Sequence, residues 1–160
     1  MPTESKALAK GTGQTWIKWI AVTLVLAIIA FLTSPNGPLG AFWPPSHDFP
    51  QPTEAQLPFF IVLNAVEALV FGFGMAFLMF GYPLVQTMWP APKWLTPAAY
   101  LSLAWLLISW WPHDSLHITN GTNMSGLLAI EYGFHVTVMV AGVILVYTLL
   151  IEGRRRGREF

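Results

Sequence analysis

The hydrophobic and polar positions of the chain fall into long blocks. Four apolar blocks are separated by shorter segments rich in proline, glycine and polar residues. The blocks cover residues 16–33, 58–82, 94–111 and 126–151. Each is near the length of about 20 residues that a helix needs to cross the hydrocarbon core of a bilayer. The pattern predicts an all-α integral membrane protein, a four-helix bundle in which residues 1–160 form a single domain.

The composition supports a membrane protein. Hydrophobic residues make up 54% of the 160 residues and charged residues only 10%, whereas soluble domains carry about 25% charged residues. The chain has no cysteine, which excludes disulfides, thiolate metal sites and cysteine nucleophiles. The net charge of zero gives no electrostatic basis for nucleic-acid binding. We therefore expect membrane lipids and other membrane subunits as partners.

The basic residues predict the orientation of the four blocks. They precede or open the first block, lie between the second and third, or follow the fourth: Lys6, Lys10, Lys18, Lys93, Arg154, Arg155, Arg156 and Arg158. The segments that follow the first and third blocks contain no lysine or arginine. By the positive-inside rule, both termini are expected in the cytoplasm, with the chain in the cell membrane. The two segments without basic residues then share the outer side.

Three ionisable residues lie inside the apolar blocks, in the half nearer the expected outer side. Glu67 and His135 are each nine residues from the outer start of their blocks, or roughly 14 Å deep, and Glu131 is at about 8 Å. A charged residue at the bilayer centre costs about 2.5–3.5 kcal/mol on translocon scales. Because Glu131 and His135 are four residues apart, they share one helix face. We expect Glu67 and His135 to face each other in a polar pocket.

The segment "PHDSLH" at residues 112–117 adds two histidines on the outer side. Pro112 suits the first turn of a short interfacial helix near residues 112–118, and Asp114 suits its positive end. On such a helix His113 and His117 share one face, directly above the buried residues. By contrast, His47 and Asp48 are expected to form a solvated loop pair.

These residues predict a site for a metal ion or haem in the outer half of the bilayer, with a redox or metal-handling role. The expected ligands of a cofactor are His113, His117 and His135, and a metal ion adds Glu67 and Glu131. Histidine and carboxylate ligands without cysteine suit iron, zinc or copper(II). A b-type haem instead needs two opposed histidines, which are His135 and either His113 or His117.

Two other classes of function stay open on the sequence alone. One is a metal-free intramembrane enzyme that uses glutamate and histidine to shuttle protons on a lipid-like substrate. The other is a non-catalytic accessory subunit whose polar stripes pack against partner helices. A hydrogen-bonded pair of Glu131 and His135 explains the same residues without any ligand. Bound metal distinguishes the first function from the other two.

Overall fold

The computed structural model describes residues 3–88 and 94–156, and within these ranges every regular element is helical. This confirms the all-α class. The elements are α1 (Thr3–Thr33), the short 3-10 helix η1 (Gly40–Phe42), α2 (Leu57–Phe80), α3 (Tyr82–Met88), α4 (Leu95–Ile108), α5 (Trp110–Asn120), α6 (Met124–Ile130), the π-helical turn η2 (Glu131–Val136) and α7 (Thr137–Arg156).

Among the described residues, three helices are long and apolar enough to cross a membrane. They are Trp16–Thr33 within α1, Leu57–Phe80, and the continuous helix Met124–Arg155 formed by α6, η2 and α7. Large apolar side chains remain exposed along them, as Val143 does at 69%, which fits contact with lipid. The apolar length and the exposed apolar side chains of these helices indicate an integral membrane protein. The third predicted block differs, because α4 has 14 residues, fewer than the about 20 that a span requires.

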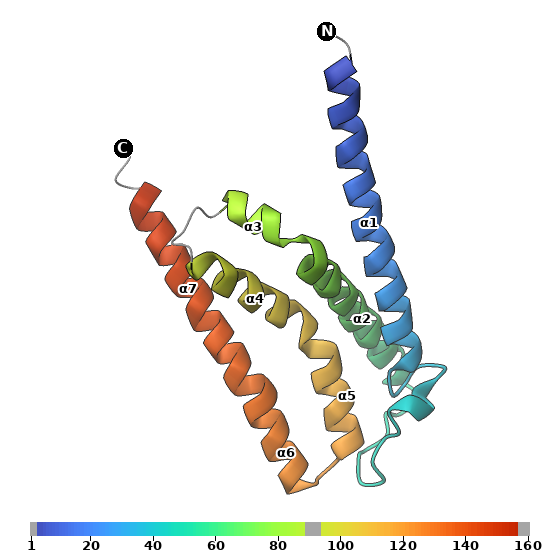
Figure 1. Cartoon of the computed structure of the whole chain (residues 1–160). Coiled ribbons are helices and arrows are strands. Elements are labelled where there is room, and N and C mark those ends of the chain that lie inside the picture. Colours follow the sequence, from blue (N-terminus) through green and yellow to red (C-terminus); the bar gives the residue numbers. More distant parts are fainter. Residues whose placement is uncertain (1–2, 89–93, 157–160) are drawn as a thin grey trace.

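Pro112 explains why the third block does not form one straight helix. A proline inside a helix lacks the N–H that would bond to the carbonyl four residues earlier, and its ring clashes with that carbonyl. The carbonyl in question belongs to Ile108, where α4 ends. The chain resumes as α5, in which the backbone N–H of His113 donates to the carbonyl of Ser109 at 3.1 Å. The resulting bend between α4 and α5 is visible in Figure 1.

The helices are arranged as an open row. α1 packs along α2, α2 packs on α4, and α4 packs on α7. Figure 1 shows α1 and α7 at opposite sides of this row. A closed four-helix bundle would require the first and last helices to pack together, so the structure does not confirm that part of the prediction.

The contact between α1 and α2 is close because Gly72 has no side chain. A Cβ atom at Gly72 would press against the carbonyl oxygen of Thr23 and lie 2.8 Å from the backbone nitrogen of Ala27. Ala27 and Gly72 are both buried there. Small residues allow two helix backbones to approach in this way where no water is present to drive association.

Residues 34–56 and the turn at 121–123 lie at the end of the molecule opposite both termini, which we call the loop end (Figure 1). Asp48 joins these two segments. Its carboxylate accepts hydrogen bonds from the hydroxyls of Ser46 and Thr122 and, at 2.9 Å, from the backbone N–H of Thr122. These hydrogen bonds, of which the one from Ser46 has the largest effect, hold the pKa of Asp48 well below its usual range. Asp48 is thus part of a structural tether, and both His47 and Asp48 are exposed in the loop, as expected for solvated residues.

Candidate metal centre

Three histidines converge near the loop end. His113 and His117 lie four residues apart on α5, and His135 lies on η2. One ring nitrogen from each histidine falls within 4.8 Å of the others. The interfacial-helix pattern of residues 112–117 therefore places its two imidazoles beside the histidine of the last apolar block.

The turn between α5 and α6 brings these histidines together. Gly121 ends α5 with a φ of 57°, a left-handed conformation that glycine adopts without steric cost. The side chain of Asn123 then accepts hydrogen bonds from the backbone N–H groups of Ser125 and Gly126, at 3.1 and 3.4 Å. This cap supplies partners for two of the free N–H groups at the start of α6. The hairpin so formed lays η2 against α5.

His135 and Glu131 lie within the π-helical turn. Such single π turns interrupt α-helices and are frequent at functional sites. The hydroxyl of Thr137 supports the turn by donating to the carbonyl of Gly133 at 2.7 Å. The same hydroxyl accepts the indole N–H of Trp105 at 2.9 Å, which ties η2 to α4. Phe134 stacks on the Trp105 ring with centroids 5.7 Å apart.

Two of the imidazole rings are each hydrogen-bonded through Nδ1 to a carboxylate. Nδ1 of His113 lies 2.7 Å from Oδ1 of Asp114, and Nδ1 of His135 lies 2.6 Å from Oε2 of Glu131. A carboxylate accepts a hydrogen bond, so each Nδ1 carries the proton. The Nε2 atoms of His113 and His135 then both present lone pairs, and they face each other at 2.9 Å. This arrangement favours a cation between the two nitrogens.

The three rings differ in burial. The side chain of His113 is 12% exposed and that of His135 is 42% exposed. His117 is partly buried, and a neutral imidazole can offer a ring nitrogen to a metal.

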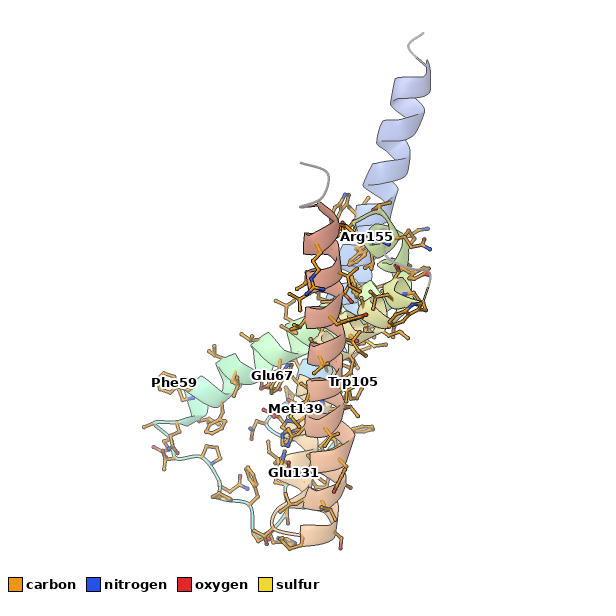
Figure 2. The ribbon with its side chains drawn as sticks, turned by 90° about the vertical axis from the view of Figure 1, so that its left-hand side faces the viewer. Phe59, Glu67, Trp105, Glu131, Met139 and Arg155 are labelled. Carbon is orange, nitrogen blue, oxygen red and sulfur yellow. The ribbon has the colours of Figure 1, made fainter. Side chains whose placement is uncertain are left out.

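Glu67 lies apart from the three histidine nitrogens. It is on α2, level with Trp105 in Figure 2, whereas Glu131 lies nearer the loop end. Glu67 and Asp114 line a cavity that His117 also lines. Within the described residues, the group whose atoms converge for a metal is the histidine triad alone. Glu131 reaches the triad through its bond to His135.

The sequence pattern indicated only a helix-terminal role for Asp114, two residues after Pro112, and not a role in the site. The adjacency of His113 and Asp114 in sequence was the available signal. Comparisons with models of protein families, with characterised proteins and with solved structures found no match to this chain. The interpretation of the site therefore rests on its own geometry.

Proposed function

We propose that this protein binds one transition-metal ion through His113, His117 and His135, in a redox or metal-handling role. We further propose a single domain that crosses the cell membrane four times, with α4 and the start of α5 as the third crossing. Both termini are then cytoplasmic, and the site lies in the outer half of the membrane. Bound iron, copper or zinc would supply Lewis-acid chemistry, and iron or copper would also supply one-electron chemistry.

The observation that carries the proposal is the pair of opposed Nε2 atoms. Donation of each remaining ring N–H to a carboxylate is the usual outer-shell arrangement of metal-bound histidines, and His113 and His135 both have it. Two nitrogens on one tetrahedral ion lie about 3.3 Å apart, given metal–nitrogen bonds of about 2.0–2.1 Å. The observed separation is 2.9 Å, so a small rotation of the two rings admits an ion.

Three histidine ligands also leave a coordination position free. Catalytic sites keep such a position for water or substrate, whereas structural sites fill it with a fourth side chain. Glu131 and Asp114 then orient ligands, and Glu67 lies in the adjoining cavity. The direct contact between His113 and His135 supports a single ion over a b-type haem, because a haem requires its planar ring between the two imidazoles.

A specific observation also favours a second function, metal-free proton transfer. Hydrogen-bonding contacts link Asp114 to His113, His113 to His135, and His135 to Glu131, and Glu67 lines a cavity together with Asp114. Side chains in such a continuous series can pass a proton from one to the next. A metal ion between His113 and His135 would interrupt this series, so the two functions exclude each other.

Metal analysis of the purified protein distinguishes them. The full-length chain is purified without chelator, incubated with iron, copper or zinc salts and desalted. We expect one equivalent of metal in the wild-type protein and in His47→Ala, but not in His135→Ala. His47 is the matched control because it is exposed on the same side of the molecule. Wild-type protein that retains no stoichiometric metal would overturn the metal function and leave proton transfer.

A further inference from the structure

The π turn at η2 takes one backbone carbonyl away from its ordinary partner. In an α-helix the carbonyl of Gly133 would accept the N–H of Thr137, four residues later. In this turn the N–H of Thr137 donates to the carbonyl of Phe134 instead. The hydroxyl of Thr137 donates to the Gly133 carbonyl at 2.7 Å and lies 3.1 Å from the Phe134 carbonyl oxygen. The side chain of Thr137 therefore closes the turn in place of its backbone.

The surroundings of Thr137 make this hydroxyl hard to replace. Thr137 is exposed on the helix Met124–Arg155, which crosses the membrane in the proposed topology. Hydrocarbon has no donor to offer, so a carbonyl left without a partner there is costly. In water a solvent molecule could take the place of the hydroxyl, but in lipid only a protein group can. The π turn that contains Glu131 and His135 thus depends on a hydroxyl at residue 137.

Trp105 fixes the direction of this hydroxyl. A hydroxyl has one hydrogen to donate and accepts through the lone pairs of its oxygen. The indole N–H of Trp105 donates to the oxygen of Thr137 at 2.9 Å, which leaves the hydroxyl hydrogen for the two carbonyls, and that of Gly133 is the nearer. Because Trp105 belongs to α4, the same bond also fixes the rotation of η2 relative to α4.

Phe134 connects this bond to the metal ligands. Its ring stacks on Trp105, with an interplanar angle of 20°, and meets the edge of the His113 ring at a centroid distance of 5.5 Å. The ring of His135, the next residue, lies 4.8 Å from that of His113. Rotation of η2 by one residue, about 100° in an α-helix, would turn His135 away from His113. The approach of the two ligands therefore depends on the rotation of η2.

We infer that Thr137 and Trp105 are positioning residues of the metal site. They hold the π turn in the rotation that places Nε2 of His135 opposite Nε2 of His113. Without the hydroxyl, the N–H of residue 137 returns to the Gly133 carbonyl, the turn becomes α-helical and His135 leaves the triad. The consequence for metal binding rests on the proposed function, whereas the placement of the two rings is testable in the metal-free protein.

Nuclear Overhauser contacts between the ring protons of His113 and His135 test the placement in the detergent-solubilised, metal-free full chain. We expect these contacts in the wild type and in Thr137→Ser, which keeps a hydroxyl, but not in Thr137→Val, which has the same shape without one. Thr148→Val is the matched control, because the Thr148 hydroxyl donates to the carbonyl of Ile144 at 2.8 Å within the α-helical stretch α7. It should keep the contacts between the two rings.

The affinity for Zn²⁺, measured against a chelator, tests the consequence for the metal. Thr137→Val and Trp105→Phe should bind Zn²⁺ about tenfold more weakly than the wild type, as for loss of an outer-shell partner. Thr137→Ser and Thr148→Val should bind it normally. Trp105→Phe keeps an aromatic ring against Phe134 and removes only the N–H, so it decides the question if Thr137→Val does not fold.

The two measurements separate this inference from the proposed function. Folded Thr137→Val or Trp105→Phe protein that keeps the ring contacts between His113 and His135 overturns the positioning role. A wild-type chain that binds no metal overturns the metal function, and the ring contacts still decide whether the hydroxyl and the indole N–H position His135.

Discussion

His113 and His135 face each other through Nε2 atoms that are 2.9 Å apart, although they lie 22 residues apart on different helices. The hairpin from α5 to η2 contains both residues, His117 and the two carboxylates that orient the rings. The triad is therefore assembled within one short stretch of chain. The helix α4 holds that hairpin through Trp105, and the loop that follows α1 holds it through the tether at Asp48.

The first prediction concerns the carboxylate behind His135. Replacing Glu131 with alanine removes the acceptor of the His135 Nδ1–H but leaves the three candidate ligands in place. Loss of such an outer-shell partner typically weakens metal affinity about 10–100-fold. Competition with a chelator of known affinity measures the change, and Glu54→Ala is the control. An affinity equal to that of wild type would show that Glu131 does not orient the ligand.

The second prediction concerns the close approach of α1 and α2. Gly72→Ala places a methyl group against the backbone of Thr23 and Ala27, which cannot yield as a flexible side chain would. We expect a loss of about 1–3 kcal/mol in the free energy of unfolding, as for other overpacked sites. Gly142→Ala is the matched control, since a Cβ there meets no atom within 4 Å.

Unfolding in mixed micelles with increasing denaturing detergent measures both glycine variants. Gly142→Ala should be neutral or slightly stabilising, because alanine is a better helix former than glycine. Equal destabilisation by the two substitutions would contradict the interpretation of Gly72 as the contact point of α1 and α2.

The third prediction concerns pH and the tether at the loop end. The folded state lowers the pKa of Asp48, so it binds the proton less readily than the unfolded chain does. The stability that the tether supplies is then fully present above the ordinary aspartate pKa of about 4. It is lost as the pH falls below that value toward the lowered pKa.

Asp48→Asn removes the negative charge of residue 48 at every pH, as protonation of Asp48 does at low pH. At pH 7 we expect the variant to unfold at a lower temperature than wild type, and the difference between the two should shrink as the pH drops below 4. A difference that stays constant down to pH 2 would mean that the charge of Asp48 does not stabilise the loop end. Glu54→Gln serves as a control for the loss of one loop carboxylate.

The fourth prediction concerns topology. The positions of the lysines and arginines predict that the C-terminus lies in the cytoplasm and residues 34–56 outside. A reporter that is active only in the cytoplasm should give a signal when fused after Phe160 and none when fused after Pro45. The reverse pattern would contradict this topology and would mean that the histidine triad lies in the cytoplasmic half of the membrane.

The sequence was informative about the elements and about the residues of the site. Block lengths located α1, α2 and the helix that begins at Met124, and the spacing of His113 and His117 predicted their common face. The predicted approach of Glu67 to His135 was based on equal depth and an ideal rotation of 100° per residue. Depth and helix rotation do not determine which neighbour a side chain meets, and in the structure Glu67 lines a cavity with Asp114 outside the histidine triad.

Two further features could not be derived from local patterns. The π turn at Glu131–Val136 changes the rotation of the helix by an amount that hydrophobic periodicity does not reveal. The tether of Asp48 to Thr122 joins residues 74 positions apart, and nothing in either segment specifies the other. The open row likewise depends on which helix faces pack together, because apolar blocks of similar composition are compatible with several arrangements.

The tether at Asp48 also provides a fixed point between two helices that lie far apart. The loop that follows α1 is fixed to the turn that leads into α6 and α7, although α1 and α7 stand at opposite sides of the row. Each terminus therefore lies about 30 helical residues away from this fixed point. The backbone N–H of Ser46 donates to the carbonyl of Ile118, next to His117, so the histidine triad lies close to this fixed point. We therefore expect motions of the termini to displace the histidine triad less than they displace the far ends of α1 and α7.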